Sequence, residues 1–234
     1  MRIVSLSAPV TEIIFALGQG RQIVAVDNLS EAPPTGPEIP RLDTGEIDFE
    51  SMKKLKPEIF FTGAGQDTLA KKLKAAGFAV VHLEPRSVNE LYRCIRETGL
   101  LLQCQKNAEE LIIRMQRDFN EVRRKAALIA RKPAVFCGVY SDGGWSVPVL
   151  VPEMIRLAGG KLSGIDQDPE TVVCLVKGQV SPSVYLNNNE FLKTLRAARE
   201  NHFFTIEQGL LDAASPRLVE GARRLFGFVF QVLH

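Results

Sequence analysis

Short runs of apolar, often β-branched residues alternate with segments of helical periodicity along most of this chain. Runs at residues 2–6, 22–26, 58–62 and 78–82 predict strands, and the segments between them carry apolar residues at helical spacing. This alternation is typical of parallel sheets that are covered by helices on both faces. The sequence therefore predicts an α/β protein.

The first predicted helix follows the first strand closely. It is predicted to begin near Thr11, a residue type that is favoured as an N-cap, and to end at Gly18. A proline- and glycine-rich stretch at residues 31–45 then predicts a long surface crossing, because proline suits neither a helix interior nor a central strand. A short helix is predicted at residues 49–55, before Pro57.

The longest predicted helix covers residues 105–131, which include no glycine or proline. Its apolar residues recur at alternating spacings of three and four: Ala108, Leu111, Met115, Phe119, Val122, Ala126 and Ile129. At 1.5 Å per residue this helix would be about 40 Å long, which is more than a small α/β unit needs. We therefore predict a strut between two bodies, with a long packing helix inside one domain as the alternative.

After this helix the alternation resumes. Residues 134–139, 184–186 and 203–206 predict strands, and residues 149–158, 190–200 and 216 onward predict helices. A chain of 234 residues can form two units of roughly 100 residues each. The predicted domains are an N-terminal α/β lobe at 1–104, the connecting helix at 105–131, and a C-terminal α/β lobe at 132–234.

Composition excludes several classes of partner. The 29 basic and 27 acidic residues are scattered, so the net charge of +2 predicts no cationic face for nucleic acid. No apolar run approaches the ~20 residues that span a bilayer, so we predict no membrane insertion. The first residues do not resemble an export signal, which predicts a cytoplasmic protein if Met1 is the natural start, and a periplasmic or cell-surface protein if a leader was removed.

The four cysteines show no C-x-x-C pairing. We interpret Cys94, Cys104, Cys137 and Cys174 as buried thiols, with a Cys94–Cys104 disulfide as an alternative only for an exported protein.

Several motifs point to one family. They are the segments 2–18 and 21–26, Ala32-Pro33-Pro34, Pro40-Arg41, the segment 49–59 with its Leu55-Lys56-Pro57-Glu58 step, and the segments 152–160 and 215–221. Together they resemble the class III substrate-binding proteins of ABC transporters, which bind cobalamin or iron-siderophores. Trp145, Pro152-Glu153-Met154 and Ala214-Ser215-Pro216-Arg217 are most similar to the cobalamin-binding branch.

This resemblance implies a fold and a ligand. The fold has two Rossmann-like α/β lobes bridged by one long rigid helix, with the ligand in the cleft between the lobes. The implied function is a monomeric, non-enzymatic binding protein for a corrinoid such as cobalamin, with no required cofactor and with an ABC permease as the implied partner. Asp67 and Glu190 match the carboxylates that such proteins present to the permease, although an acid in the first turn of a helix is also favoured by the helix dipole.

Open α/β sheets bind ligands beyond the carboxyl ends of their strands. The loops predicted there are residues 7–10, 28–32, 44–45, 63–67, 140–145, 187–189 and 209–212. From these loops we select eleven candidate ligand-binding residues: Ser7, Ala8, Pro9, Asn28, Leu29, Thr44, Gly63, Tyr140, Trp145, Leu210 and Leu211. Trp145 could lie against a flat macrocycle, or it could instead plug the core of its lobe.

The sequence also allows ligands other than a corrinoid. Loop aromatics that are typical of the cobalamin branch are replaced by Leu29, Ala32, Thr44 and Leu210, so an iron-siderophore or haem is an alternative. An anionic siderophore complex would call for basic residues, and the selected loops contain none. Arg41 and Arg217 lie nearby in the sequence, but we interpret Arg217 equally as a structural tie.

The sequence also bears on several rival functions. Gly63-Ala64-Gly65 followed by Glu84 mimics a dinucleotide fingerprint, but Thr68 replaces the third glycine and Asp67 would repel a pyrophosphate, so an NAD-dependent enzyme is disfavoured. No nucleophile motif is present, and His82, His202 and His234 have no ligand partner at recognisable spacing, so we predict no catalytic and no metal site. A cytosolic binding protein without a transport role stays open.

Overall fold

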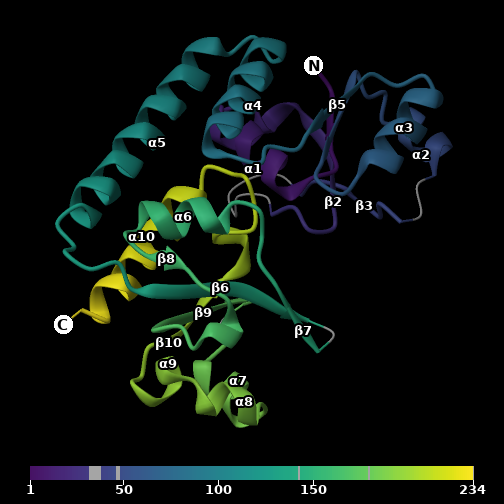
Figure 1. Cartoon of the computed structure of the whole chain (residues 1–234). Helices are drawn as coiled ribbons and strands as arrows, with labels where there is room; N and C mark the ends of the chain where they lie inside the picture. Colours follow the sequence, from purple (N-terminus) through teal and green to yellow (C-terminus); the bar gives the residue numbers. More distant parts are fainter. Residues whose placement is uncertain (32–37, 46–47, 142, 179, 234) are drawn as a thin grey trace. The chain divides into compact units, whose positions relative to one another are not determined.

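A computed structural model of the chain describes residues 1–31, 38–45, 48–141, 143–178 and 180–233. The predicted loop residue Ala32, the Ala32-Pro33-Pro34 motif, part of the proline-rich crossing and His234 lie outside these ranges. The chain divides into two compact units, one made of residues 1–113 and 214–216 and the other of residues 114–213 and 217–234 (Figure 1). Each unit has its own sheet. The exact boundaries of the predicted lobes, 1–104 and 132–234, stay a prediction.

The first unit has a five-stranded sheet in the order β3-β2-β1-β4-β5, in which all neighbours are parallel. Its elements are β1 (Ile3–Ser5), α1 (Ala8–Ala16), β2 (Ile23–Asp27), β3 (Arg41–Leu42), α2 (Phe49–Lys54), β4 (Ile59–Gly63), α3 (Asp67–Ala75), β5 (Val80–Leu83) and α4 (Val88–Leu101), with a 3-10 turn at Gly20–Gln22. The strands β1 and β4 are fully buried, as expected for a parallel sheet that is covered on both faces.

The second unit has a mixed sheet in the order β10-β9-β6-β7, with β8 beside β6; β7 alone is antiparallel to its neighbour. Its strands are β6 (Ala134–Ser141), β7 (Gly144–Ser146), β8 (Lys161–Leu162), β9 (Thr171–Val176) and β10 (Phe203–Glu207). Its helices are α6 (Val151–Leu157), α7 (Pro182–Asn187), α8 (Glu190–Thr194), α9 (Arg196–Arg199) and α10 (Leu218–Gln231), with 3-10 turns at Ile165–Gln167 and Gln208–Leu210.

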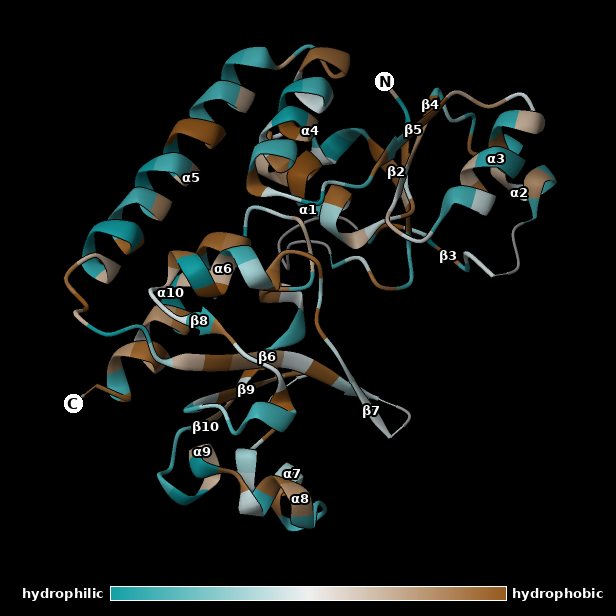
Figure 2. Ribbon diagram, viewed as in Figure 1, coloured by the Kyte–Doolittle hydropathy of each residue, from teal (hydrophilic) through white to brown (hydrophobic). Residues whose placement is uncertain are grey.

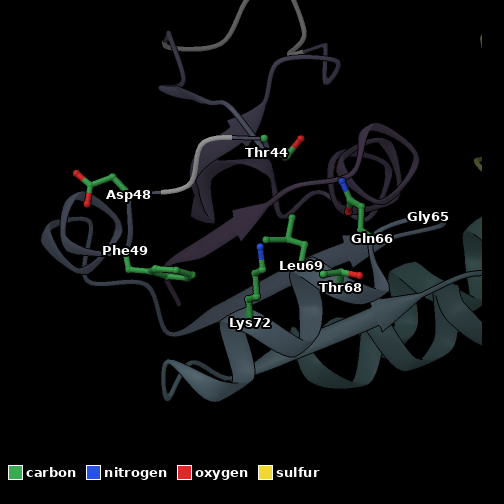
Figure 3. Close-up of a pocket in the computed structure, with 9 residues that line it drawn as sticks. Thr44, Asp48, Phe49, Gly65, Gln66, Thr68, Leu69 and Lys72 are labelled. Carbon is green, nitrogen blue, oxygen red and sulfur yellow. The ribbon is translucent and has the colours of Figure 1, made fainter.

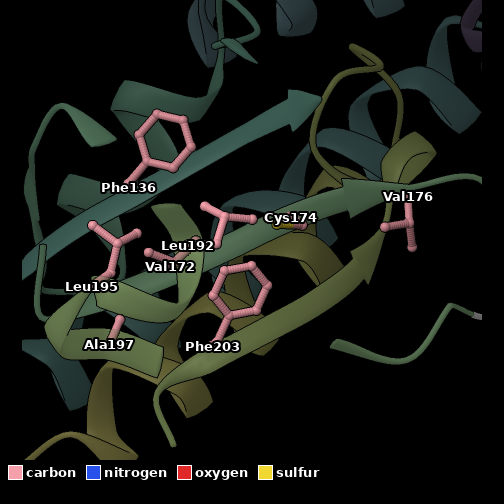
Figure 4. Close-up of a cluster of buried hydrophobic side chains, with 8 residues drawn as sticks. All are labelled: Phe136, Val172, Cys174, Val176, Leu192, Leu195, Ala197 and Phe203. Atoms are coloured by element: carbon pink, nitrogen blue, oxygen red, sulfur yellow. The ribbon is translucent and has the colours of Figure 1, made fainter. Parts of the chain in front are cut away.

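A dry core stabilises the second sheet. Alternate residues of β9, Val172, Cys174 and Val176, face the buried Leu192 of α8 (Figure 4). Figure 2 shows the apolar character of β6, whose buried residues Val135, Phe136 and Cys137 point to both faces of the sheet. The thiols are free and buried, as predicted, and burial raises the pKa of Cys94 to about 11.

The long helix α5 (Gln105–Ala126) is continuous, as predicted, and the division between the two units falls within it, after Ile113. The predicted end at residue 131 is wrong, because the helix ends five residues earlier. The amides of Leu128 and Ile129 bond to carbonyls three residues back, as in a turn. Arg131 pairs with Glu170, which also accepts a hydrogen bond from the amide of Ala134 at 3.1 Å. The bonds of Glu170 hold residues 131–134 beside the start of β6, so the chain does not continue as a helix.

Three other predictions were wrong. Thr11 is not an N-cap, since α1 starts at Ala8 with Pro9 in its first turn and Ser7 at the cap position. Residues 184–186 form part of helix α7, because Pro182 at its first position starts a helix that overrides the strand propensity of Val184. Within the predicted 190–200 helix, Leu195 is extended and the amide of Arg196 bonds to Asp168 at 2.7 Å, which separates α8 from α9.

The strand β9 was missed, although its signal is visible. Residues 171–176 are six consecutive buried residues, mostly β-branched, between Pro169 and Gly178. Such a run is typical of a central strand in a parallel sheet. Within the described residues, no helix has both the length and the apolar character that crossing a bilayer requires.

Candidate functional site

The carboxyl ends of the first sheet gather the predicted residues of that unit. The loops after β1, β2, β3 and β4 all leave from one edge, because these strands are parallel. The residues at this edge are Ser7, Ala8, Pro9, Asn28, Leu29, Thr44 and Gly63. Leu29 is the most exposed of their large side chains at 76%, so it offers free apolar surface there.

A buried polar network underlies this edge. The hydroxyl of Thr11 lies 2.8 Å from the hydroxyls of both Ser5 and Ser30, and it also bonds to the carbonyl of Ser7 at 3.1 Å. Ser30 in turn donates from its amide to a carboxylate oxygen of Asp27 at 3.1 Å and also bonds it through its hydroxyl. The network fixes the loops after β1 and β2. It also gives hydrogen-bond partners to buried polar groups, which would destabilise the fold if they were left unpaired.

Gly63 and Gln66 fix the neighbouring loop. A Cβ at Gly63 would lie 2.2 Å from the hydroxyl oxygen of Ser7, so a side chain at this position would push the two loops apart. The side chain of Gln66 accepts a hydrogen bond from the Gly63 amide at 2.9 Å and donates to the carbonyl of Leu6 at 2.6 Å. The loops after β1 and β4 are therefore cross-linked.

A pocket of about 710 Å³ opens beside this edge (Figure 3). Thr44 lines it, together with Phe49 from α2 and Leu69 and Lys72 from α3. Its other described lining residues include the carboxylate of Asp48 and polar neutral groups such as Gln66 and Thr68, so one cation and one anion face the pocket and it has little capacity for a highly charged ligand.

Arg41 is occupied by structure. Its guanidinium donates to three backbone carbonyls, those of Asp27 at 3.4 Å, Asn28 at 3.1 Å and Ser30 at 2.7 Å. All three bonds are made by Nη1, through which Arg41 shapes the loop after β2.

The carboxyl ends of the second sheet form a pocket of about 760 Å³. Residues that follow β6, β9 and β10 line it, and its polar groups include Tyr140, Ser146, Lys177, Gln208 and Asp212. Tyr185 of α7 completes the wall. Burial raises the pKa of the Tyr185 phenol and of the Asp212 carboxyl, so both groups resist ionisation.

Trp145 belongs to a strand and not to the predicted loop. It pairs with Tyr140 across the β6–β7 hairpin, with ring centroids 5.0 Å apart, and meets Phe136 edge-on at 5.2 Å. Trp145 is partly buried and packs against the core of the second unit, which favours the core-plug interpretation. Tyr140 is 38% exposed and is therefore the more accessible ring of the pair.

Leu210 and Leu211 do not offer the exposed apolar surface that the sequence suggested. Both are fully buried. Helix α10 approaches them so closely that a Cβ at Gly221 would lie 2.2 Å from the carbonyl oxygen of Leu210. Nearby, Arg217 pairs with Glu207 at 2.8 Å, as expected for a structural tie.

The two predicted docking carboxylates differ in their settings. Asp67 is the first residue of α3, directly after β4, as predicted. Glu190 also starts a helix, but α7 precedes it and not a strand, so the predicted match between two strand-to-helix turns is wrong. The predicted loop 187–189 likewise joins two helices. Docking by either residue stays a prediction.

Some residues of these pockets were missed by the sequence analysis. They are Lys72, Lys177 and Tyr185, whereas Gln66 and Asp212 lie in the predicted loops 63–67 and 209–212 but were not selected as single residues. Lys177 follows β9, so finding that strand would have placed it at the sheet edge. Tyr185 had no local signal, because only the folded chain brings α7 to this pocket.

Comparisons with known proteins agree with this architecture. The model of a family described as "Periplasmic binding protein" matches residues 3–161. An uncharacterized ABC transporter substrate-binding lipoprotein, YvrC of Bacillus subtilis, is 24% identical over 96% of this chain and 78% of its own length. A vitamin B12-binding protein of Photorhabdus laumondii is 22% identical over 69% of this chain and 60% of its own.

A solved structure shares the fold. The periplasmic heme-binding protein RhuT from Roseiflexus sp. RS-1, in its apo form, superposes with a TM-score of 0.85 over 100% of this chain and 99% of its own, at 22% identity. This likeness, together with the two separate sheets, shows a two-lobed α/β fold.

Proposed function

The chain belongs to the periplasmic binding protein family, and from this premise we propose that it binds a corrinoid such as cobalamin for an ABC permease. The family consists of solute-binding proteins and not of enzymes. In this proposal the ligand lies against the carboxyl ends of the sheet strands. No cofactor takes part.

One observation carries the proposal: a pocket of ligand size lies beside the carboxyl edge of the first sheet and another at that of the second, and each has one lysine among its described lining residues. The pockets measure about 710 and 760 Å³, within the range of ~300–1,000 Å³ that is usual for small-molecule sites. Lys72 and Lys177 are the cations among their described lining residues. Polar neutral groups such as Tyr140, Tyr185 and Gln208 suit the amide-bearing rim of a corrinoid better than an anionic ferric siderophore.

Haem is the second candidate, and the phenols of the second pocket favour it. Tyrosine oxygen is one of the ligands that proteins use to hold haem iron. Tyr140 and Tyr185 both line the pocket. The fold likeness to a heme-binding protein is compatible with this alternative.

Absorbance titration tests the proposal with cyanocobalamin, cobinamide, haemin and a ferric siderophore, while the fluorescence of Trp145, the single tryptophan, is followed. We expect saturable corrinoid binding with quenching of Trp145, which touches Tyr140 at the pocket wall. If haemin binds and this binding is lost in Tyr140→Phe or Tyr185→Phe, haem and not a corrinoid is the ligand. No binding across the panel would refute both.

Transport is the remaining part of the proposal. Asp67 and Glu190 are exposed, and we propose them as the contacts for basic pockets of a permease. Exchange of both for alanine should leave ligand affinity unchanged and reduce stimulation of the transporter ATPase. Unchanged stimulation would refute their role.

A further inference from the structure

Three potential metal ligands from two elements meet in the first unit. Asp67 begins α3, His82 lies on β5, and Glu84 comes directly after that strand. One donor atom from each lies within 4.8 Å of the others, and no second group of three such residues occurs in the described parts of the chain. The expectation of no metal site rested on spacing along the sequence, which does not show that Asp67 of α3 lies beside His82 and Glu84.

The imidazole of His82 is held in a binding orientation. Its Nδ1 lies 2.9 Å from the hydroxyl of Thr62, its cross-strand neighbour on β4. Its Nε2 is buried but has no hydrogen-bond partner among the described residues. It points instead at the carboxylates, 3.7 Å from Asp67 and 3.9 Å from Glu84. A partner that fixes one ring nitrogen and leaves the other to a cation is the usual arrangement around ligating histidines.

The spacing and charge both fit a single small cation. Two donors at about 2.1 Å from a tetrahedral zinc ion lie roughly 3.4 Å apart, close to the separations seen here. Glu84 uses its other oxygen to pair with Arg86 at 3.0 Å, which fixes the carboxylate from outside the cluster. Two carboxylates and a neutral imidazole would neutralise a divalent ion.

We propose that Asp67, His82 and Glu84 bind one divalent transition-metal ion, with zinc as the probe. The imidazole favours zinc or a similar ion over magnesium and calcium, which prefer sets of oxygen ligands. Three protein ligands leave a coordination position for water. This site does not depend on corrinoid binding, but it uses Asp67, which is also one of the two proposed permease contacts, so zinc binding and ATPase stimulation are measured separately.

The cysteines are poor competitors for the ion. All four are buried, and burial raises the pKa of each thiol, so the thiolate that a metal needs is disfavoured. The matched histidine is His202, which is 20% exposed against 21% for His82 but has the single carboxylate of Glu200 nearby, 3.7 Å from its Nδ1.

The test is a zinc titration of the metal-free full chain against a chromogenic chelator. We expect one equivalent in the wild type, at least a tenfold loss of affinity in His82→Gln, and no change in His202→Gln. Asp67→Asn exchanges an exposed ligand without disturbing the core and should also weaken binding. Thr62→Val, which removes only the partner of Nδ1, should cost about tenfold.

Cobalt provides a second measurement, because the spectrum of bound cobalt reports its ligands directly. Wild type should give a four-coordinate spectrum without thiolate bands, and His82→Gln should lose it while circular dichroism shows an intact fold. Failure to bind zinc, equal affinity in His82→Gln, or a loss in His202→Gln would overturn the proposal.

Discussion

The polar side chains at the carboxyl edges of the two sheets have different roles. At the first edge, the polar groups bond to one another: Thr11 connects Ser5 to Ser30, and Gln66 connects two loops. At the second edge, Tyr140 is exposed, and burial raises the pKa of Asp212 against the opposing effects of a hydrogen bond with Gln208 and the charge of Lys177. The first edge uses its polar chemistry for its own loops, and the second keeps groups available for a ligand.

The largest expected effect is on ligand affinity at the second edge. Tyr140→Ala removes an exposed ring from the pocket and should weaken corrinoid binding about 30-fold, or about 2 kcal/mol, as for a typical aromatic hot spot. Phe191→Ala is the matched control, since Phe191 is a 48%-exposed aromatic of the same unit that does not line this pocket. Titration of both variants decides the matter, and equal losses would remove the second edge from the site.

Thr11 and Thr171 are both buried, but their removal should change the free energy of unfolding differently. Thr11→Val breaks the network of the first edge and should cost about 1–3 kcal/mol, because partners such as the Ser30 hydroxyl lose a buried bond. Thr171 of β9 is also fully buried, yet its hydroxyl has no partner among the described residues. Thr171→Val should therefore be neutral or stabilising.

Urea unfolding of the two variants separates these cases. The two substitutions are chemically identical, so the difference between them measures the network alone. Equal destabilisation by both would show that the first edge gains nothing from its hydrogen bonds.

Sequence patterns predicted much of the fold but less of the site. Periodicity found four of the five strands of the first sheet, because burial on both faces leaves continuous apolar runs, and it found the long helix. It missed β3, which has two residues and lies in the proline-rich stretch, and it failed where one residue overrides the pattern, as Pro182 does in turning Val184 from strand to helix. The site combines residues from distant segments, such as Tyr185 and Asp212 in one pocket or Asp67 and His82 in the metal cluster, and no local pattern shows that they lie together.

A paired carboxylate extends the comparison within the second unit. Burial alone would raise the pKa of Glu170, but hydrogen bonds from Arg131 and the Ala134 amide outweigh it and lower that pKa below 4.5. A lowered pKa stabilises the fold above the unfolded value and loses this effect as the pH falls through the folded value. Glu170→Gln should therefore destabilise the protein by about 1 kcal/mol at pH 7 and progressively less below pH ~4.5.

Thermal unfolding across pH measures this effect. Glu190→Gln is the control, because Glu190 pairs with Lys193 at the surface, where such pairs contribute about 0–1 kcal/mol. A destabilisation by Glu170→Gln that persists unchanged at pH 3 would contradict the charge-based account.

The smallest expected effect has the opposite sign. Burial raises the pKa of Asp212 above 3.8, so the folded state binds its proton more tightly than the unfolded chain does. The charged carboxylate becomes a cost as the pH rises through the folded pKa, and Asp212→Asn removes that cost. The variant should unfold about 1–2 °C higher than wild type at pH 7, with the gain narrowing toward pH 4. Asp166→Asn controls for the loss of one exposed charge. A lower midpoint at pH 7 would mean that the hydrogen bond with Gln208 and the charge of Lys177 outweigh the burial of Asp212, and the contrast between the two edges would fail.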